Sequence, residues 1–420
     1  MTAKRRSFIK TAVTAGAVAI LPKMALANKK LTSSKRVIVI GGGFAGATAV
    51  KYLSMWSPNT EVIMIERNVQ FVSCPQSNLV LGGSRSLQQL TRGYHGLSDN
   101  HGVNTVQAEA VSIDTDKQTV TLIDDSTLNY DRLILAPGVD FIYDDYPQLE
   151  NQEKIPHAWR AGPQTALLRT QLMAMKQGGT AIMTVPATPF KCPPGPYERA
   201  CQIAHFFKQH NPTAKLIILD ANADVVSKKG LFKAAWKEHY AGLIDYIPNS
   251  TIEHIDINTL TIETEFDQFQ ADVLNVIPPQ KAGKVAEMAG VVNVDKRWCK
   301  VDFLTYESTA KSNVHIIGDA IHAKLPKSAH MANAQAKVCA AAIASLFAEQ
   351  EPEQEPVFNN TCYSFVTDTE AVHVAAVYRY NAEEKQMNTM PGSGVSGKSS
   401  ELEGAYADAW AKNIWADTLK

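Results

Sequence analysis

The sequence predicts an α/β fold with two parallel-sheet halves and a small C-terminal α+β domain. Three observations lead to this prediction: strand–helix–strand patterns at residues 36–66 and 178–220, and a late strand at 315–319 that ends in Gly-Asp. Short β-branched runs beside helical periodicity are typical of buried parallel strands. A chain of 420 residues is long enough for two or three domains with substantial cores.

The first strand–helix–strand pattern contains a glycine-rich turn. A strand at residues 36–40 leads into Gly-Gly-Gly-Phe-Ala-Gly, a helix extends to residue 52, and the next strand ends in an acid 20 residues past the last glycine. Such glycines let the backbone approach a pyrophosphate, and the acid is placed to bind a ribose. We expect a dinucleotide with an unphosphorylated ribose, FAD or NAD, to bind at Gly41, Gly43, Gly46, Glu66 and Arg67.

Two later motifs favour FAD over NAD. Residues 130–135 form a strand that enters the tight turn Ala136-Pro137-Gly138, and the strand from residue 315 ends in Gly318-Asp319. In two-domain flavoproteins a carboxylate at this kind of strand end binds the ribityl chain. The N-terminus of the helix that follows then faces the flavin ring. We therefore expect these five residues to bind FAD.

The second strand–helix–strand pattern has lost its glycine loop. Strands at 178–185 and 214–220 enclose a helix at 197–209, but the loop before this helix carries several prolines and Cys192. Proline has no N–H group to donate to a phosphate and fixes φ. We expect no NAD(P)H site here and a thiol in its place.

Residues 1–27 have the pattern of a cleaved export signal. Lys4, Arg5 and Arg6 precede an apolar run at 12–21 that is too short to cross a bilayer, and residues 25–27 are Ala-Leu-Ala. The paired arginines fit the twin-arginine type, which exports folded proteins in bacteria. We expect cleavage near Ala27 and a periplasmic location, with an uncleaved anchor helix as the alternative.

The charge and cysteine content exclude several functions. The formal net charge of −1 becomes more negative without the signal, and this gives no basic footprint for nucleic acid. No other stretch approaches a transmembrane length. The six cysteines form no C-x-x-C-H, C-x-x-C or zinc spacing, so we predict no metal site and no haem c on this chain. Cys201, Cys299 and Cys339 lie in apolar contexts that predict buried thiols.

The C-terminal region is rich in Tyr, Trp and polar residues. Tyr406, Trp410, Ile414 and Leu419 recur at roughly helical spacing, a stripe that we assign to a core or an interface rather than a membrane anchor. The glycine- and serine-rich residues 391–397 predict a flexible loop.

Together these features resemble the flavoprotein subunit of flavocytochrome c sulfide dehydrogenase. The resemblance spans nearly all of the mature chain and includes the glycine loop and further blocks at 73–78, 156–159, 192–199, 277–280, 317–319 and 360–363. It implies a glutathione-reductase-like flavoprotein with two dinucleotide domains. The expected divisions are a signal (1–27), an FAD-binding domain (28–140 and 275–345), a second nucleotide-like domain (141–274) and a C-terminal interface domain (346–420).

The resemblance also assigns roles to individual residues. It implies a thioether from Cys74 to the 8α-methyl of FAD, although Pro75 departs from an aromatic found in some members and a buried structural thiol is the alternative. It implies that Cys192 and Cys362 form a redox-active disulfide beside the flavin. The spacing of these two cysteines does not itself show the pairing.

Two further positions have roles implied by the same resemblance, and two flanking charges are judged from the residues alone. Glu198 matches an acid near the cystine, although a surface residue at a helix start fits the sequence equally well. Trp410 matches an aromatic residue near the flavin, and packing explains it almost as well. Lys191 and Arg199 either attract the anionic substrate or are solvated flanking charges.

The implied activity is periplasmic oxidation of sulfide or polysulfide through the cystine and FAD. A separate c-type cytochrome subunit would take the electrons, so haem c is expected only on a partner chain. Two alternatives remain. One is an enzyme like sulfide:quinone reductase, which shares the fold and the cysteine chemistry but binds membranes through amphipathic C-terminal helices. The other is a non-catalytic flavin-bearing partner of a sulfur-oxidation complex.

Overall fold

The computed structural model describes residues 35–151 and 153–420. The predicted export signal at 1–27 lies outside these residues. Within the described part, no helix is both long and apolar enough to span a membrane.

A five-stranded parallel sheet forms the first half of the protein. Its order is β19-β9-β1-β2-β5, and its strands are β1 (Lys35–Ile40), β2 (Thr60–Ile65), β5 (Asn104–Val106), β9 (Arg132–Leu135) and β19 (Val314–Ile316). The apolar runs that predicted three of these strands are fully buried, with Val37, Ile38 and Val39 at 0 % exposure. Ile40 pairs with Ile65 and with Leu135, so the carboxyl ends of three strands meet at one edge.

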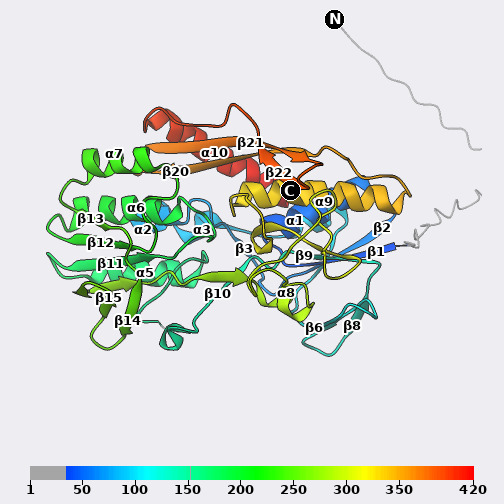
Figure 1. The fold of residues 1–420 in the computed structure, drawn as a ribbon, viewed down its shortest axis with the longest axis horizontal. Helices are drawn as coiled ribbons and strands as arrows, with labels where there is room; N and C mark the ends of the chain where they lie inside the picture. The colour runs from blue at the N-terminus through cyan, green and yellow to red at the C-terminus, as the bar shows by residue number, and fades with distance from the viewer. Residues whose placement is uncertain (1–34, 152) are drawn as a thin grey trace, which may run out of the picture. The chain divides into compact units, whose positions relative to one another are not determined.

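Helices α1 (Phe44–Trp56) and α9 (Ala329–Phe347) pack against each other beside this sheet (Figure 1). Smaller elements come from the same stretch of the chain. They are the antiparallel pair β3 (Phe71–Val72) and β4 (Thr91–Arg92), the antiparallel sheet β6 (Ala110–Asp114), β7 (Thr119–Leu122) and β8 (Thr127–Asn129), and the helices α2 (Asn78–Gly82), α3 (Leu87–Leu90) and α4 (His95–His101). Of these, α2 packs against helices of the second half.

A four-stranded parallel sheet forms the second half. Its order is β13-β12-β11-β17, with β11 (Thr180–Val185), β12 (Lys215–Asp220), β13 (Ile244–Ile247) and β17 (Val273–Asn275). It is accompanied by α5 (Pro163–Ala174), α6 (Gly195–His210) and α7 (Lys229–His239), and by the antiparallel strands β14 (Ile252–Asp256), β15 (Thr261–Thr264) and β16 (Gln268–Gln270). The predicted strand–helix–strand frame is therefore present without its glycine loop.

An antiparallel pair lies where the chain passes between the two halves. It consists of β10 (Val139–Phe141) and β18 (Gln280–Ala282), and the short helix α8 (Lys284–Met288) follows. The predicted boundary at 274 falls inside β17, whose last residue, Asn275, still pairs with Met183 of the second sheet.

The C-terminal region is an antiparallel sheet followed by one long helix. Strands β20 (Val357–Phe365), β21 (Ala371–Asn381) and β22 (Gln386–Thr389) pair in sequence order, and α10 (Glu401–Leu419) ends the chain. β20 and β21 extend from α6 and α7 of the second half to α9 of the first (Figure 1). This sheet therefore carries residues to the junction of both halves.

Two details of this region differ from a simple reading of the sequence. The loop predicted at 391–397 contains the short strand β23 (Gly394–Val395), which pairs with β21. Along α10, Ile414 and Leu419 are buried as expected, whereas Tyr406 is half exposed.

Helix α10 packs closely against the β20–β21 turn at Gly404. A methyl group added at Gly404 would stand 1.8 Å from the Thr369 carbonyl oxygen. We expect Gly404→Ala to lower the free energy of unfolding by about 1–3 kcal/mol through overpacking. Urea unfolding measures this change. Gly397→Ala is the control, because its added methyl group meets no atom within 4 Å. Equal stability of the two variants would contradict the packing of α10 described here.

Candidate functional site

One large cavity, of about 1020 Å³, opens where the first sheet, the second half and the C-terminal sheet meet. Its lining includes most of the residues that the sequence predicted for cofactor binding and chemistry. Those residues are Gly43, Glu66, Arg67, Cys74, Ala136, Gly138, Cys192, Glu198, Gly318, Asp319, Cys362 and Trp410. Their convergence joins segments that lie up to hundreds of residues apart.

Two glycines of the turn after β1 stand close to neighbouring backbone atoms, and a third faces open space. Gly41 has a φ of +104°, and an alanine there would place its Cβ 2.4 Å from the Ala136 carbonyl oxygen. A Cβ at Gly46 would stand 1.8 Å from the Gly41 carbonyl oxygen. Gly43 begins helix α1, lines the cavity and has no atom within 4 Å of a built Cβ. A phosphate can therefore approach the helix N-terminus at Gly43.

Glu66 stands at the end of β2, where the sequence placed a ribose-binding acid. Its carboxylate is buried and accepts hydrogen bonds from the Gly42 N–H at 2.5 Å and from the Asn68 N–H at 2.7 Å. These bonds fix the carboxylate against the glycine turn. Arg67 is exposed at the cavity margin and pairs with Glu109 at 3.6 Å.

The turn after β9 contributes two of its three predicted residues to the lining. Ala136 and Gly138 line the cavity, and Gly138 has a φ of +64°. Pro137 is absent from the lining. Its carbonyl oxygen instead faces Gly283, where a Cβ would come within 2.5 Å. Pro137 therefore positions the turn against the segment that precedes α8.

Asp319 lines the cavity at the end of β19. Its Oδ1 atom is buried and has no hydrogen-bond partner among the described residues. Burial raises the pKa of Asp319, and the nearby ammonium groups of Lys191 and Lys327 oppose that effect. A buried carboxylate oxygen without a partner is costly unless a ligand donates to it. A ribityl hydroxyl is a donor of the right kind.

The glycine cradle, the ribose-binding acid and the unpartnered Asp319 oxygen fit a dinucleotide flavin. Gly43 would hold the pyrophosphate, Glu66 the adenosine ribose and Asp319 the ribityl chain. The volume of the cavity is at the upper end of the range for ligand pockets, as a ligand the size of FAD requires.

Cys192 lies in the proline-rich loop between β11 and α6. Its φ of +57° is left-handed, its N–H donates to the Lys327 carbonyl at 2.7 Å, and its carbonyl accepts from the Gly195 N–H at 2.8 Å. A methyl group at Gly195 would come within 2.9 Å of the Cys192 sulfur. The loop therefore needs this glycine to place the thiol at the cavity wall.

Cys362 lies in the middle of β20, opposite Val374 of β21. It and Cys192 are separate thiols in the structure, and both line the cavity. Burial raises the pKa of Cys192, and negative charge on Cys362 raises it further, so the two sulfurs are electrostatically coupled. The fold thus brings to one cavity two cysteines that are 170 residues apart in the sequence.

Glu198 and Arg199 are buried, which excludes the alternative that they are solvated surface charges. Glu198 accepts a hydrogen bond from Asn78 Nδ2 at 2.8 Å and another from the Phe365 N–H at 2.8 Å. Arg199 Nε donates to Asn78 Oδ1 at 3.1 Å, and its guanidinium stacks 4.7 Å from the Trp159 ring centroid. Burial raises the pKa of Glu198, while its two hydrogen bonds oppose the shift.

Cys74 lines the cavity and has a cation beside its sulfur. Lys191 Nζ lies 3.1 Å from the Cys74 Sγ and 3.2 Å from the Trp159 carbonyl oxygen. Burial would lower the pKa of Lys191, but the charges of Cys74, Asp319 and Cys192 outweigh burial and raise it. Lys191 therefore interacts with Cys74, Asp319 and Cys192 and is not a solvated flanking charge.

Trp410 of α10 lines the cavity within an aromatic cluster. Its ring centroid lies 5.9 Å from that of His330 and 6.0 Å from that of Tyr363. His330 Nδ1 accepts a hydrogen bond from the Thr361 N–H at 3.0 Å, next to Cys362. Trp410 thus lines the cavity and also packs against its neighbours, so the predicted position near the flavin and a packing role are compatible.

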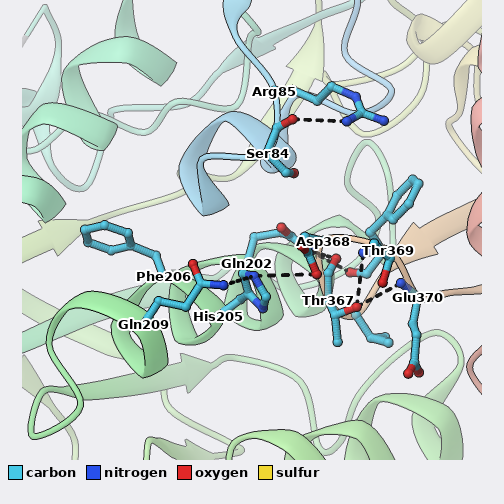
Figure 2. Close-up of polar contacts among 12 residues, drawn as sticks. Ser84, Arg85, Gln202, His205, Phe206, Gln209, Thr367, Asp368, Thr369 and Glu370 are labelled. Atoms are coloured by element: carbon cyan, nitrogen blue, oxygen red, sulfur yellow. Dashed lines mark hydrogen bonds and ion pairs between the residues drawn. The ribbon is translucent and has the colours of Figure 1, made fainter. Parts of the chain in front are cut away.

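The β20–β21 turn is anchored to the second half of the protein. Gln202 of α6 donates to the Phe365 carbonyl at 3.2 Å. It also donates to the Thr367 carbonyl at 2.8 Å (Figure 2). The Tyr240 hydroxyl donates to the Val366 carbonyl at 2.5 Å. These contacts fix the strand that carries the C-terminal cysteine of the site.

Sequence reasoning did not single out Lys228 or Lys327. Lys228 looks like part of a polar turn in Ser-Lys-Lys-Gly, yet it is buried against β20. Lys327 donates to the Asp319 and Ile321 carbonyls at 2.8 and 2.7 Å. No local pattern marks Lys228, because its partners on β20 lie 134 and 136 residues away. The partners of Lys327 lie 8 and 6 residues before it, but they are backbone carbonyls, which leave no pattern in the sequence. Cys201, Cys299 and Cys339 are fully buried, as predicted.

Three family models match this chain. They are the central part of the sulfide dehydrogenase [flavocytochrome c] flavoprotein chain over residues 165–278, the flavin-binding part of flavocytochrome c sulphide dehydrogenase over 354–419, and pyridine nucleotide-disulphide oxidoreductase over 35–173. The second match includes Cys362 and Trp410. The first includes Cys192, Glu198 and Lys228.

Individual relatives agree with these matches. The sulfide dehydrogenase [flavocytochrome c] flavoprotein chain of Chlorobaculum thiosulfatiphilum is 49% identical over 47 residues, which cover 11% of this chain and 98% of that sequence. The mitochondrial sulfide:quinone oxidoreductase of Dictyostelium discoideum is 21% identical over 330 residues, covering 74% of this chain and 71% of the relative.

Among solved structures, the sulfide:quinone oxidoreductase of Aquifex aeolicus has the same fold. Its TM-score is 0.77 at 19% identity, and the match covers 92% of both chains. The predicted two-domain flavoprotein fold is therefore confirmed. With its flavin-binding and central regions both matched, this chain belongs to the family of flavocytochrome c sulfide dehydrogenase flavoprotein chains, which are FAD-dependent, sulfide-oxidising oxidoreductases.

Proposed function

We propose that this protein oxidises hydrosulfide through a Cys192–Cys362 disulfide and FAD, and passes the electrons to a c-type cytochrome subunit. One observation carries the proposal. Two thiols from different domains line the same cavity as Gly43 of the glycine turn and Asp319. Such an arrangement serves thiol–disulfide exchange next to a redox cofactor.

The first step is exchange at sulfur. Hydrosulfide attacks one sulfur of the disulfide, a new S–S bond forms, and the old bond breaks with its electron pair on the other cysteine. One cysteine then carries a persulfide and the other is a thiolate. Bound in this cavity, FAD supplies what thiols lack, namely acceptance of an electron pair and its release as single electrons.

Glu198 is proposed to accept the proton that the persulfide loses. It lies in the first turn of α6, three residues beyond Gly195, against which the Cys192 sulfur rests. Burial raises the pKa of Glu198 above its usual value. A carboxylate with a raised pKa is a better proton acceptor near neutral pH.

Cysteine substitutions test this exchange. We expect Cys192→Ser and Cys362→Ser to slow sulfide-dependent bleaching of the flavin absorbance by roughly 10²-fold or more, because a serine hydroxyl cannot form a disulfide. Anaerobic stopped-flow spectroscopy measures the rate, and bound FAD is measured separately. Cys299→Ala, which changes a buried thiol outside the cavity lining, is the control and should bleach normally. Normal bleaching in both serine variants would contradict the cystine mechanism. Failure of the wild type to bleach would favour a non-catalytic flavin carrier.

The electron acceptor is proposed to be a cytochrome. The matched family names describe the flavoprotein chain of a flavocytochrome, and the loop after β11 has four prolines among residues 186–194 in place of glycines. The four prolines have no N–H to donate to the pyrophosphate of NAD(P)H, and the N–H groups of Thr188, Lys191 and Cys192 donate within the protein.

We expect the sulfide-reduced protein to reduce a soluble c-type cytochrome faster than it reduces a water-soluble quinone analogue, because the matched family is the flavoprotein chain of a flavocytochrome. Absorbance of the reduced haem and of the reduced quinone gives the two rates. A faster rate with the quinone would instead assign the sulfide:quinone reductase activity of its structural relatives.

The site of action is proposed to be the periplasm, on the evidence of the twin-arginine pattern at residues 1–27. Mass spectrometry of the protein recovered from that compartment should give a mature chain starting at Asn28. A chain that retains residues 1–27 in the cytoplasm would contradict export.

FAD is proposed to be attached covalently through Cys74. The sulfur lines the cavity, and Lys191 places a cation 3.1 Å from it. Acid precipitation of the wild-type protein should therefore leave the flavin with the protein pellet. Cys74→Ala should release it to the supernatant, whereas Cys299→Ala should retain it. Release of the flavin from the wild type would contradict the thioether.

A further inference from the structure

Lys228 is a buried lysine directly behind the C-terminal cysteine of the site. Its side chain is 8 % exposed, and its left-handed backbone, with a φ of +53°, turns it away from solvent at the start of α7. Its Nζ donates to the Cys362 carbonyl oxygen at 2.9 Å and to the Ser364 hydroxyl at 2.8 Å. Lys228 is absent from the cavity lining, so it acts on the site through β20.

The charge of Lys228 is poorly balanced in the structure. Among the described residues, no carboxylate lies within 4.0 Å of its Nζ, and its two closest partners are neutral oxygen atoms. Burial lowers its pKa to about 8, and the negative charges of Cys362, Glu198, Cys192 and Glu403 act against that shift. A buried ammonium normally needs a counter-charge. These four groups lie on β20, α6, the proline-rich loop and α10, and two of them are the thiols of the site.

Two other lysines near the site, the half-buried Lys191 and the buried Lys327, have different partners. Lys191 binds Cys74 and the Trp159 carbonyl, and Lys327 binds the carbonyls of Asp319 and Ile321. Of these three lysines, Lys228 is the one that donates hydrogen bonds to β20, the strand that carries Cys362.

We propose that Lys228 is a positioning residue of the sulfide-oxidising site: it holds the Cys362 backbone in place, and its positive charge stabilises the thiolate left when the Cys192–Cys362 disulfide is opened. The inference rests on the proposed function. The bond that breaks leaves its electron pair on a cysteine sulfur, and the counter-charge for that sulfur is already inside the protein. No further oxidant or reductant is involved in this step.

The experiment measures thiolate formation without sulfide. The holoenzyme is reduced anaerobically with dithiothreitol and exchanged into iodoacetamide at a series of pH values. Mass spectrometry then follows alkylation of the Cys192 and Cys362 peptides. In Lys228→Gln, which keeps hydrogen-bond donors but loses the charge, we expect the alkylation midpoint of the more reactive thiol to rise by about one pH unit or more.

Matched variants separate charge from structure. Lys228→Arg keeps the charge and should stay near the wild-type midpoint. Lys229→Gln, which changes an exposed neighbour paired with Asp224 at 2.6 Å, should have no effect. Lys228→Met is a second neutral variant that keeps the packing volume and should behave like Lys228→Gln.

An unchanged midpoint in either neutral variant that retains bound FAD would overturn the inference. Loss of folding in both neutral variants, with Lys228→Arg intact, would also overturn it, since the charge would then serve the fold itself. Absence of sulfide-dependent bleaching in the wild type contradicts the proposed function instead, and leaves the alkylation result to be judged separately.

Discussion

The site depends on one buried hydrogen-bonded group, formed by Asn78, Glu198 and Arg199. Asn78 belongs to α2 of the first half, Glu198 and Arg199 belong to α6 of the second half, and Glu198 also binds the Phe365 N–H of β20. Arg199 continues the network to the Asn275 side chain. Three parts of the protein are thereby fixed relative to one another beside the cavity. Removing one member would leave the others buried and unpaired, which costs more than the intact network contributes to stability.

The same network explains how a cavity wall can carry several charges. Cations and potential anions alternate around it: Lys191 beside Cys74, Arg199 beside Glu198, and Lys228 behind Cys362. The three cations donate to backbone carbonyls, to amide or hydroxyl side chains, or to the Cys74 sulfur. A site built in this way can gain or lose one unit of negative charge with little rearrangement, because the compensating groups are already oriented.

Much of the fold follows from local sequence. The β-branched strand before Gly41, the acid at Glu66 and the Gly318-Asp319 strand end are short-range patterns, and the structure contains a strand or turn at each. The burial of Glu198 could not be predicted in this way. Its environment is set by Asn78 and Phe365, which lie 120 and 167 residues away, and an acid at a helix start is usually exposed. The placement of Cys192 and Cys362 at one cavity, and of Lys228 behind Cys362, likewise depends on how β20 crosses both halves.

The contrast between the backbones of Cys192 and Cys362 has a kinetic consequence. Cys362 is fixed in a paired strand, whereas Cys192 lies in a loop whose left-handed turn is held by single hydrogen bonds to Lys327 and Gly195. When the proposed disulfide opens, the covalent link between the loop and the strand is lost. The local concentration of each thiol around the other is then set only by the surrounding scaffold. A rigid scaffold would keep that effective molarity high. Turnover would then depend on how little the Cys192 loop and the Cys362 strand move apart while the disulfide is open.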